Sequence, residues 1–200
     1  MIAPIRELEQ ALSKLPGFGR RSASRAALAL VRERSRLAEP LAAALKSASE
    51  NVVCCSRCGG FTTIHDNPCR MCVDETREKT VVCVVEEPSD IVSIESSGAF
   101  CGRYHALGGK FSALKAASSV KIRIDELKER VVREGFTEVL LALSTDMEGD
   151  ATAGYVTEVL GPLGVKITRL AFGLPADSGV AYSDPLTLKR AISYRITQLN

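Results

Sequence analysis

The segment TVVCVVE, Thr80–Glu86, is the part of this 200-residue sequence that decides its fold. Its five consecutive apolar residues lack the polar alternation of a strand with one face in water, so they are typical of a buried parallel strand. Two similar runs follow, Val139–Leu143 and Val165–Ala171, and a helical pattern precedes each of them: Asp125–Glu134 and Ala151–Leu160. Strands that alternate with helices predict a βαβ sheet with right-handed crossovers.

The composition is that of a globular protein. Hydrophobic residues make up 46% of the chain and charged residues 25%, and the length allows one large domain or two smaller ones with a core. No stretch approaches 18 consecutive apolar residues, so we expect no membrane span. The first ten residues include both acids and bases and lack an apolar signal core, which favours a cytoplasmic location.

Charge is unevenly distributed along the chain. Residues 1–36 contain eight Lys or Arg against three acids, a net charge of +5, whereas residues 125–160 contain nine acids against three bases, a net charge of −6. This asymmetry favours a basic surface for a polyanion at one end and an acidic surface with another role elsewhere. Two solvated helix faces are the alternative interpretation.

The N-terminal region has a helical pattern from Ile5 to Leu45. Apolar residues recur there at spacings of three and four until Pro16-Gly17-Phe18-Gly19 interrupts the pattern, which resumes at Ser22. A third helix is predicted around Ala38–Asn51. Two glycines one residue apart, directly before a helix, allow close approach of a partner, and the amides at the helix start favour an anion.

Basic residues flank this turn and could bind phosphates: Lys14, Arg20, Arg21 and Arg25. The pattern is typical of a helix–hairpin–helix, which holds the nucleic-acid backbone without reading its sequence. A simple interhelical turn is the alternative, because G-x-G alone is a weak signal.

Between the helical region and the first strand stands CSRCGGFTTIHDNPCRMC, Cys55–Cys72. Its two C-x-x-C pairs predict a structural site with one zinc ion per chain and four ligands: Cys55, Cys58, Cys69 and Cys72. Disulfides or a redox pair are the alternatives, and His65 could replace one cysteine. Ten intervening residues cannot bury a core, so the metal would supply the stability. Cys54 is adjacent to the first ligand but breaks the C-x-x-C spacing, so it is predicted not to bind the metal. Cys83 and Cys101 are predicted to be small, buried apolar residues.

Acidic residues follow two of the predicted strands. Glu86 ends the first strand, and Asp146, Glu148 and Asp150 come just after the second. Ligands bind at the carboxyl ends of neighbouring strands in an open α/β sheet, and carboxylates that meet there could hold Mg²⁺. An acidic loop that caps the following helix, with Asp150 before Ala151, is the alternative.

Taken in order, several motifs resemble the RecR family of bacterial recombination mediators. They are the Leu-Pro-Gly-x-Gly turn, the four cysteines, the Val-Val-Glu strand, GRYHALGG (Gly102–Gly109), EGDATAGY (Glu148–Tyr155) and RLAFGLP (Arg169–Pro175). The resemblance implies a Toprim fold, shared with topoisomerases and primases, in a ring that clamps DNA as a tetramer or dimer. It also implies work with RecO, and in some settings RecF, to load recombinase at single-stranded gaps.

The resemblance also assigns residues and parts. Arg21 and Arg25 fall where the family's hairpin places DNA-binding residues, the four cysteines match its zinc ligands, and the acids match its Toprim carboxylates: Glu86, Asp146, Glu148 and Asp150. The expected fold is a mixed α+β and α/β chain in four parts. These are a helix–hairpin–helix (residues 1–53), a four-cysteine zinc finger (54–73), a Toprim-type βαβ domain (79–174) and a short C-terminal segment for oligomerisation or partners (175–200).

The sequence departs from a catalytic Toprim pattern. Ser144 stands where a topoisomerase-like Asp-x-Asp pair has its first acid, and none of the four tyrosines lies in a motif for a strand-cleaving nucleophile. Residues 112–120 and 180–182 also differ from the family's usual pattern. We therefore expect a DNA-binding repair protein that is not an enzyme, whose acids dock a basic partner or form a weak Mg²⁺ site.

Two other function classes stay open at this point. One is a Mg²⁺-dependent Toprim nuclease or primase-like enzyme, and the other is a zinc-stabilised adaptor without DNA affinity. For the cysteine module, a scaffold that orients its neighbours is favoured over DNA contact through Arg57 or Arg70.

Overall fold

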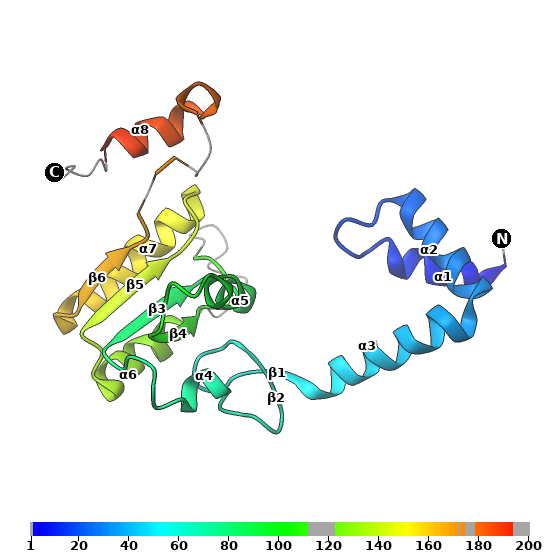
Figure 1. Cartoon of the computed structure of the whole chain (residues 1–200), viewed down its shortest axis with the longest axis horizontal. Helices are drawn as coiled ribbons and strands as arrows, with labels where there is room; N and C mark the ends of the chain where they lie inside the picture. Colours follow the sequence, from blue (N-terminus) through cyan, green and yellow to red (C-terminus); the bar gives the residue numbers. More distant parts are fainter. Residues whose placement is uncertain (1, 112–122, 172, 175–178, 194–200) are drawn as a thin grey trace. The chain divides into compact units, whose positions relative to one another are not determined.

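The computed structural model describes residues 2–111, 123–171, 173–174 and 179–193 (Figure 1). The chain divides into two compact units, Met1–Val52 and Val53–Asn200. The atypical segment 112–120 lies outside the described residues, whereas residues 180–182 form a short 3-10 turn, η4. No helix within the described ranges is long and apolar enough to cross a membrane.

The first unit is helical, as the sequence predicts. It consists of α1 (Ala3–Leu12), α2 (Arg20–Arg32), a short π-helical segment η1 (Arg34–Ala38) and α3 (Glu39–Asn51). The predicted break between the first two helices is confirmed, because the chain leaves the helix after Leu12 and re-enters it at Arg20.

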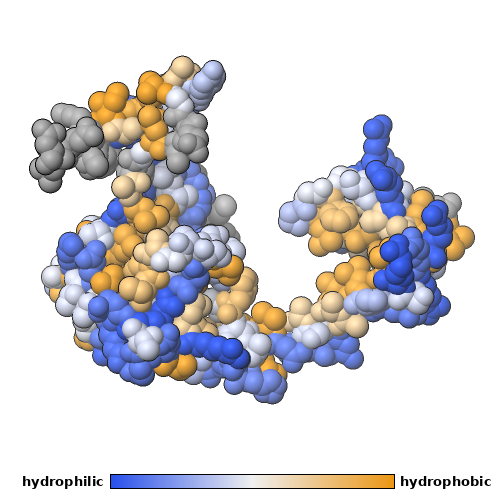
Figure 2. Space-filling view, in the orientation of Figure 1, coloured by the Kyte–Doolittle hydropathy of each residue, from blue (hydrophilic) through white to orange (hydrophobic). Residues whose placement is uncertain are grey.

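The first unit buries little of its own apolar surface. Among its described residues only Ala23 and Ala27 are buried in the core. Figure 2 shows hydrophobic surface on these helices, and large apolar side chains stand exposed there: Leu15, Phe18, Leu28, Val31, Leu41 and Leu45. Two alanines are a very small core for about 50 residues, since small domains already bury a limited share of their surface.

The second unit contains a four-stranded parallel sheet in the order β4-β3-β5-β6. Its strands are β3 (Val81–Val85), β4 (Arg103–Ala106), β5 (Glu138–Ala142) and β6 (Lys166–Arg169). The helices between them are α5 (Pro88–Ser97), α6 (Ile124–Glu134) and α7 (Met147–Leu160), followed by the 3-10 turn η3 (Gly161–Leu163). All three predicted strands and both predicted helices are confirmed.

Helices cover both faces of the sheet, which explains the unbroken apolar run of β3. Val82 and Val84 pack with residues of α6 and α7, whereas Cys83 and Val85 pack on the other face with Ile91 of α5. All four of these β3 side chains are fully buried. A strand covered on both faces needs apolar residues at every position, not at alternate ones.

The cysteine module precedes the sheet within the second unit. It contains the two-stranded sheet β1 (Val52–Cys54) and β2 (Phe61–Thr63) and the short helix α4 (Arg70–Val73). Burial raises the pKa of the Cys83 thiol to about 12, in line with its predicted role as a small apolar residue. The same prediction is wrong for Cys101, which is exposed. Cys101 lies just before β4, which is an edge strand of the sheet.

Candidate functional site

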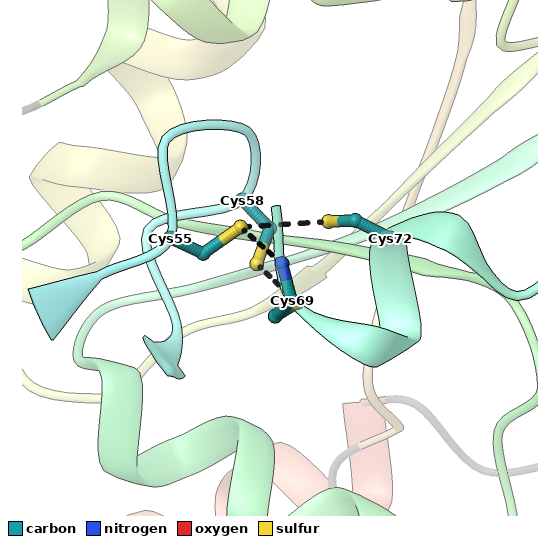
Figure 3. A group of neighbouring side chains, drawn as sticks. All are labelled: Cys55, Cys58, Cys69 and Cys72. Atoms are coloured by element: carbon teal, nitrogen blue, oxygen red, sulfur yellow. Dashed lines mark hydrogen bonds between the residues drawn. The ribbon is translucent and has the colours of Figure 1, made fainter. Parts of the chain in front are cut away.

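Four cysteines of the second unit form a compact, buried cluster (Figure 3). Cys55 and Cys58 lie in the turn after β1, Cys69 is the N-cap of α4, and Cys72 lies within that helix. Each is at most 3% exposed, and their sulfur atoms all lie within 4.8 Å of one another. The structure therefore brings all four predicted ligands together, whereas His65 is exposed and outside the cluster.

The spacing of the sulfurs fits a tetrahedral metal ion. The Sγ atoms of Cys58 and Cys69 are 3.6 Å apart, and those of Cys55 and Cys72 are 3.9 Å apart. Tetrahedral Zn²⁺ with Zn–S bonds of about 2.3 Å needs sulfurs roughly 3.8 Å apart. No disulfide joins any of the seven cysteines. The cluster can therefore hold a metal such as zinc.

Main-chain amides and neighbouring thiols surround the four sulfurs. Main-chain amides of Arg57 and Cys69 donate hydrogen bonds to Cys55 Sγ at 3.4 and 3.2 Å, and Gly60 N donates to Cys58 Sγ at 3.4 Å. The hydrogen bond from Cys58 lowers the pKa of Cys55, whereas the contact with Cys55 raises that of Cys72. Four adjacent thiolates repel one another unless a cation lies between them, so binding of a metal here would be coupled to folding of the module.

A partly buried polar network joins the module to the sheet domain. Arg57 forms a bidentate pair with Glu134 of α6, at 3.0 and 2.9 Å, and donates to the Cys72 carbonyl oxygen at 2.9 Å. Burial raises the pKa of Glu134, but hydrogen bonds from Arg57 and Arg130 outweigh it and lower that pKa to about 2. Arg57 is thus engaged within the fold, while Arg70 is exposed and pairs with Asp66 at 3.6 Å.

The predicted hairpin in the first unit presents the start of α2. Gly17 has a φ of +79°, a left-handed conformation that favours glycine, and the N-cap Gly19 has no side chain to accept from the first helical amides. Those amides have no partner inside the helix, so they can bind an anion. The four predicted DNA-binding residues are exposed, and no ion pair joins them to other described residues: Lys14, Arg20, Arg21 and Arg25.

Two of the four acids meet at the carboxyl ends of neighbouring strands. Glu86 follows β3, and its Oε1 accepts hydrogen bonds from both the amide and the hydroxyl of Ser144, each at 2.7 Å. Lys110 pairs with Glu86 at 3.6 Å and also with Asp146. The ammonium therefore bridges the two carboxylates, in the position where a divalent cation would be expected to bind.

Asp146 is also the N-cap of α7, and its side chain accepts a hydrogen bond from the main-chain amide of Gly149 in the first turn of that helix. The hydrogen bond from Lys110, followed by those from Gly149 N and the Ser144 hydroxyl, lowers the pKa of Asp146 to about 2. The alternative interpretation, an acidic loop that caps the following helix, is confirmed for Asp146 and wrong for Asp150, because the helix begins at Met147. A Cβ at position 149 would collide with Ser144, so glycine allows this close approach.

The remaining two acids differ from each other. Asp150 forms ion pairs with Arg169 at 2.7 Å and with Arg190 of the C-terminal helix α8 (Pro185–Ser193) at 3.0 Å. Glu148 is exposed, and no ion pair joins its carboxylate to another described residue. Over the described ranges the cysteine cluster is the one group of His, Cys, Asp or Glu with metal-binding spacing.

Sequence reasoning missed the cations of this acidic edge. Lys110 directly follows the Gly108-Gly109 pair after β4, and its loop is fixed by a hydrogen bond from Phe111 N to Thr152 Oγ1 at 2.9 Å. The position after the glycine pair was the available signal for Lys110. Arg169 and Arg190 are distant in sequence from the acids, so nothing local indicated them.

Known proteins match both units of the chain. The family described as RecR, helix-hairpin-helix matches residues 5–49, and the Toprim domain family matches residues 80–171. Recombination protein RecR from Desulfatibacillum aliphaticivorans is 46% identical over 184 residues, which is 92% of each chain. Recombination protein RecR from Methylorubrum populi is 46% identical over 191 residues, 96% of this chain and 94% of that protein. The chain belongs to the RecR family of recombination proteins.

Proposed function

We propose that the protein is a DNA-binding recombination mediator in recombinational DNA repair, and that it holds DNA through its helix–hairpin–helix. The observation that carries the proposal is the exposed, unpaired basic group around the uncapped start of α2. Membership of the RecR family supports it. Contacts from amides and arginines to phosphate are independent of base identity, so such a hairpin binds DNA of any sequence.

Zinc is the metal we propose for the cysteine cluster, with one ion per chain. With four sulfur ligands and no open position, it would hold the module together instead of activating a substrate. Two contacts fix the module on the sheet domain. Arg57 pairs with Glu134 of α6, and the Cys58 carbonyl oxygen accepts a hydrogen bond from Ala106 N of β4 at 2.7 Å. Its proposed role is a scaffold.

The Toprim acids of this chain are proposed to be non-catalytic. Lys110 pairs with both Glu86 and Asp146, and Ser144 supplies a hydroxyl where a catalytic pair would have a further carboxylate. Of the four tyrosines, Tyr104 is buried, Tyr155 stacks on Phe111, Tyr182 lies in η4, and position 194 is outside the described residues. A Mg²⁺-dependent nuclease or primase-like enzyme would instead convert labelled DNA to a new product when Mg²⁺ is added.

Assembly and partners complete the proposal. A ring-like homo-oligomer, tetramer or dimer, would cover the apolar side chains that the first unit leaves exposed, such as Leu28 and Val31. In the C-terminal segment, Tyr182 is 91% exposed and Ile192 is 63% exposed, which suits a contact between copies. The mass in solution, with and without DNA, measures the number of subunits. RecO, and in some settings RecF, are the proposed protein partners.

The hairpin is tested by the double variant Arg21→Ala/Arg25→Ala. We expect weaker binding to unrelated DNA sequences by a similar factor, and a salt dependence reduced by about one unit per lost phosphate contact. Arg34→Ala/Lys46→Ala is the matched control, since it removes two exposed charges from the same unit. Fluorescence anisotropy at several salt concentrations measures both quantities. Unchanged affinity and slope in the hairpin variant would place DNA binding elsewhere.

A further inference from the structure

A basic cavity lies at the amino-terminal edge of the sheet, opposite the acids. It has a volume of about 360 Å³ and is lined by residues of the cysteine module, the segment before β3, the start of β4 and the end of α6: Arg57, Glu75, Lys79, Arg103, Arg133 and Glu134. This lining contains four cations and two acids and no aromatic or aliphatic residue. A cavity of this size can accommodate a small charged group with part of its carrier.

The two acids in the cavity already have partners. Glu134 is paired with Arg57 and Arg130, and its side chain is 9% exposed. Glu75 pairs with Lys79 on the surface. Arg103 and Arg133 therefore contribute positive charge that these acids do not balance, apart from a single Arg133–Glu134 contact at 3.5 Å.

Arg103 is the unusual residue of the cavity. It is 4% exposed, and within the described part of the chain no carboxylate lies at ion-pair distance from it, although its charge acts on Asp74 and Glu75 from further away. The one hydrogen bond of its side chain runs from Nη1 to the Met71 carbonyl oxygen at 2.6 Å. Its other guanidinium nitrogens have no hydrogen-bond partner among the described residues, and they are not fully enclosed. They therefore reach solvent where Arg103 lines the cavity. A guanidinium has five N–H donors, and burying it without a directly bound acceptor for most of them is costly.

We propose that this basic cavity binds a phosphate group. Phosphate has several acceptor oxygens, which can accept from guanidinium and ammonium groups that approach from different elements. The polar lining would bind the anion and leave an attached base or other group outside. The phosphate could belong to the backbone of a bound DNA strand or to a free phosphate compound, and only the first source rests on the proposed function.

The first arm of the test titrates pyrophosphate into the full-length, zinc-loaded protein by calorimetry at constant ionic strength. Arg133→Glu should weaken binding by about tenfold, the effect of losing one charge-assisted hydrogen bond. Lys128→Glu is the matched control, because it reverses an exposed charge on the same helix but outside the cavity. Arg103→Gln should abolish pyrophosphate binding. If that variant loses zinc or unfolds at a lower temperature, Lys79→Glu, a change at the surface of the cavity, takes its place and should weaken pyrophosphate binding.

The second arm measures the salt dependence of single-stranded DNA binding. If DNA supplies the phosphate, Arg133→Glu lowers the slope by about one unit and adds to the effect of Arg21→Ala/Arg25→Ala. If pyrophosphate binding is lost while the DNA slope is unchanged, a free phosphate compound is the ligand. The proposal is overturned if Arg133→Glu and Lys128→Glu have equal effects, or none, in both arms. If Arg21→Ala/Arg25→Ala leaves DNA binding unchanged, the proposed function fails, but loss of pyrophosphate binding in Arg133→Glu would still support the phosphate site.

Discussion

His105 is one of two histidines in the chain, and the fold buries it completely. Its Nδ1 accepts from Arg130 Nη1 at 3.0 Å, and its Nε2 donates to the Arg123 carbonyl oxygen at 2.8 Å, which defines a neutral imidazole. Burial, followed by the positive charge of Arg130, lowers the pKa of His105 to about 3, although Glu134 nearby acts in the opposite direction. The imidazole therefore serves the structure as a neutral link between β4 and α6.

This link predicts how stability depends on pH. The folded pKa lies below the unfolded value of about 6.5, so the unfolded chain binds the proton more readily. The stabilisation is complete above pH 6.5 and is lost as the pH falls toward 3, roughly 2–3 kcal/mol between pH 6.5 and 4.5. His105→Gln can keep both hydrogen bonds without titrating, so its unfolding free energy should fall less over that range in urea titrations.

The exposed histidine provides the control for this prediction. His65→Gln should keep the pH dependence of the original chain, because His65 is exposed in the module. Any loss of a bound metal at acidic pH would affect all three proteins alike and cancel in their differences. Parallel curves for His105→Gln and the original chain would refute a buried, neutral His105.

At the scale of elements, the cysteine module contributes little apolar core of its own. Its buried cluster consists of the four cysteines, with Met71 packed against both this cluster and the core of the sheet domain. A metal bound at this cluster would therefore supply most of the free energy that folds the module. The ion pair of Arg57 with Glu134 then holds the folded module on α6.

Removing one sulfur ligand tests the metal centre. Cys58→Ser should lose the metal and lower the free energy of unfolding by about 3 kcal/mol or more, because a structural metal site is lost. Cys54→Ser changes an exposed neighbour and should stay within about 0.5 kcal/mol of the original chain. Elemental analysis with urea unfolding checks both variants. Well under one zinc per folded chain would exclude the proposed ion.

On the scale of the whole molecule, the acidic edge is mostly balanced from within. Lys110 pairs with both Glu86 and Asp146, and two arginines pair with Asp150, so three cations balance these three acids. Glu148 keeps an exposed carboxylate without an ion pair among the described residues. We therefore predict that Glu148 makes the main electrostatic contribution of this edge to docking a basic partner, with RecO as the proposed one.

Docking at this edge predicts a salt-dependent effect of Glu148→Ala. The variant should associate more slowly with RecO at low salt and lose part of the salt dependence, since charges across an interface chiefly set the association rate. Glu158→Ala, also exposed and on α7, is the control. Stopped-flow titrations at low and high salt measure the rates. An unchanged rate and salt dependence would exclude docking, and increased DNA affinity would show that Glu148 repels DNA.

The sequence by itself determined those features that local chemistry encodes. Apolar runs such as Val81–Val85 predicted buried strands, the Pro16–Gly19 turn predicted the break between helices, and the C-x-x-C spacing predicted the four clustered ligands. In each case a few neighbouring residues carry the whole signal. Strand β4 was missed because Arg103, Tyr104 and His105 look polar, although the fold buries all three.

The tertiary structure alone decided which charges meet. Lys110 reaches Asp146 across 36 residues, and Arg57 reaches Glu134 across 77 residues, so no local pattern could reveal either pair. These pairs decide whether the acids are free to bind a metal and how the cysteine module is held on the sheet domain. Local sequence sets backbone preference and burial, whereas electrostatic partners depend on distances in space that only the folded chain fixes.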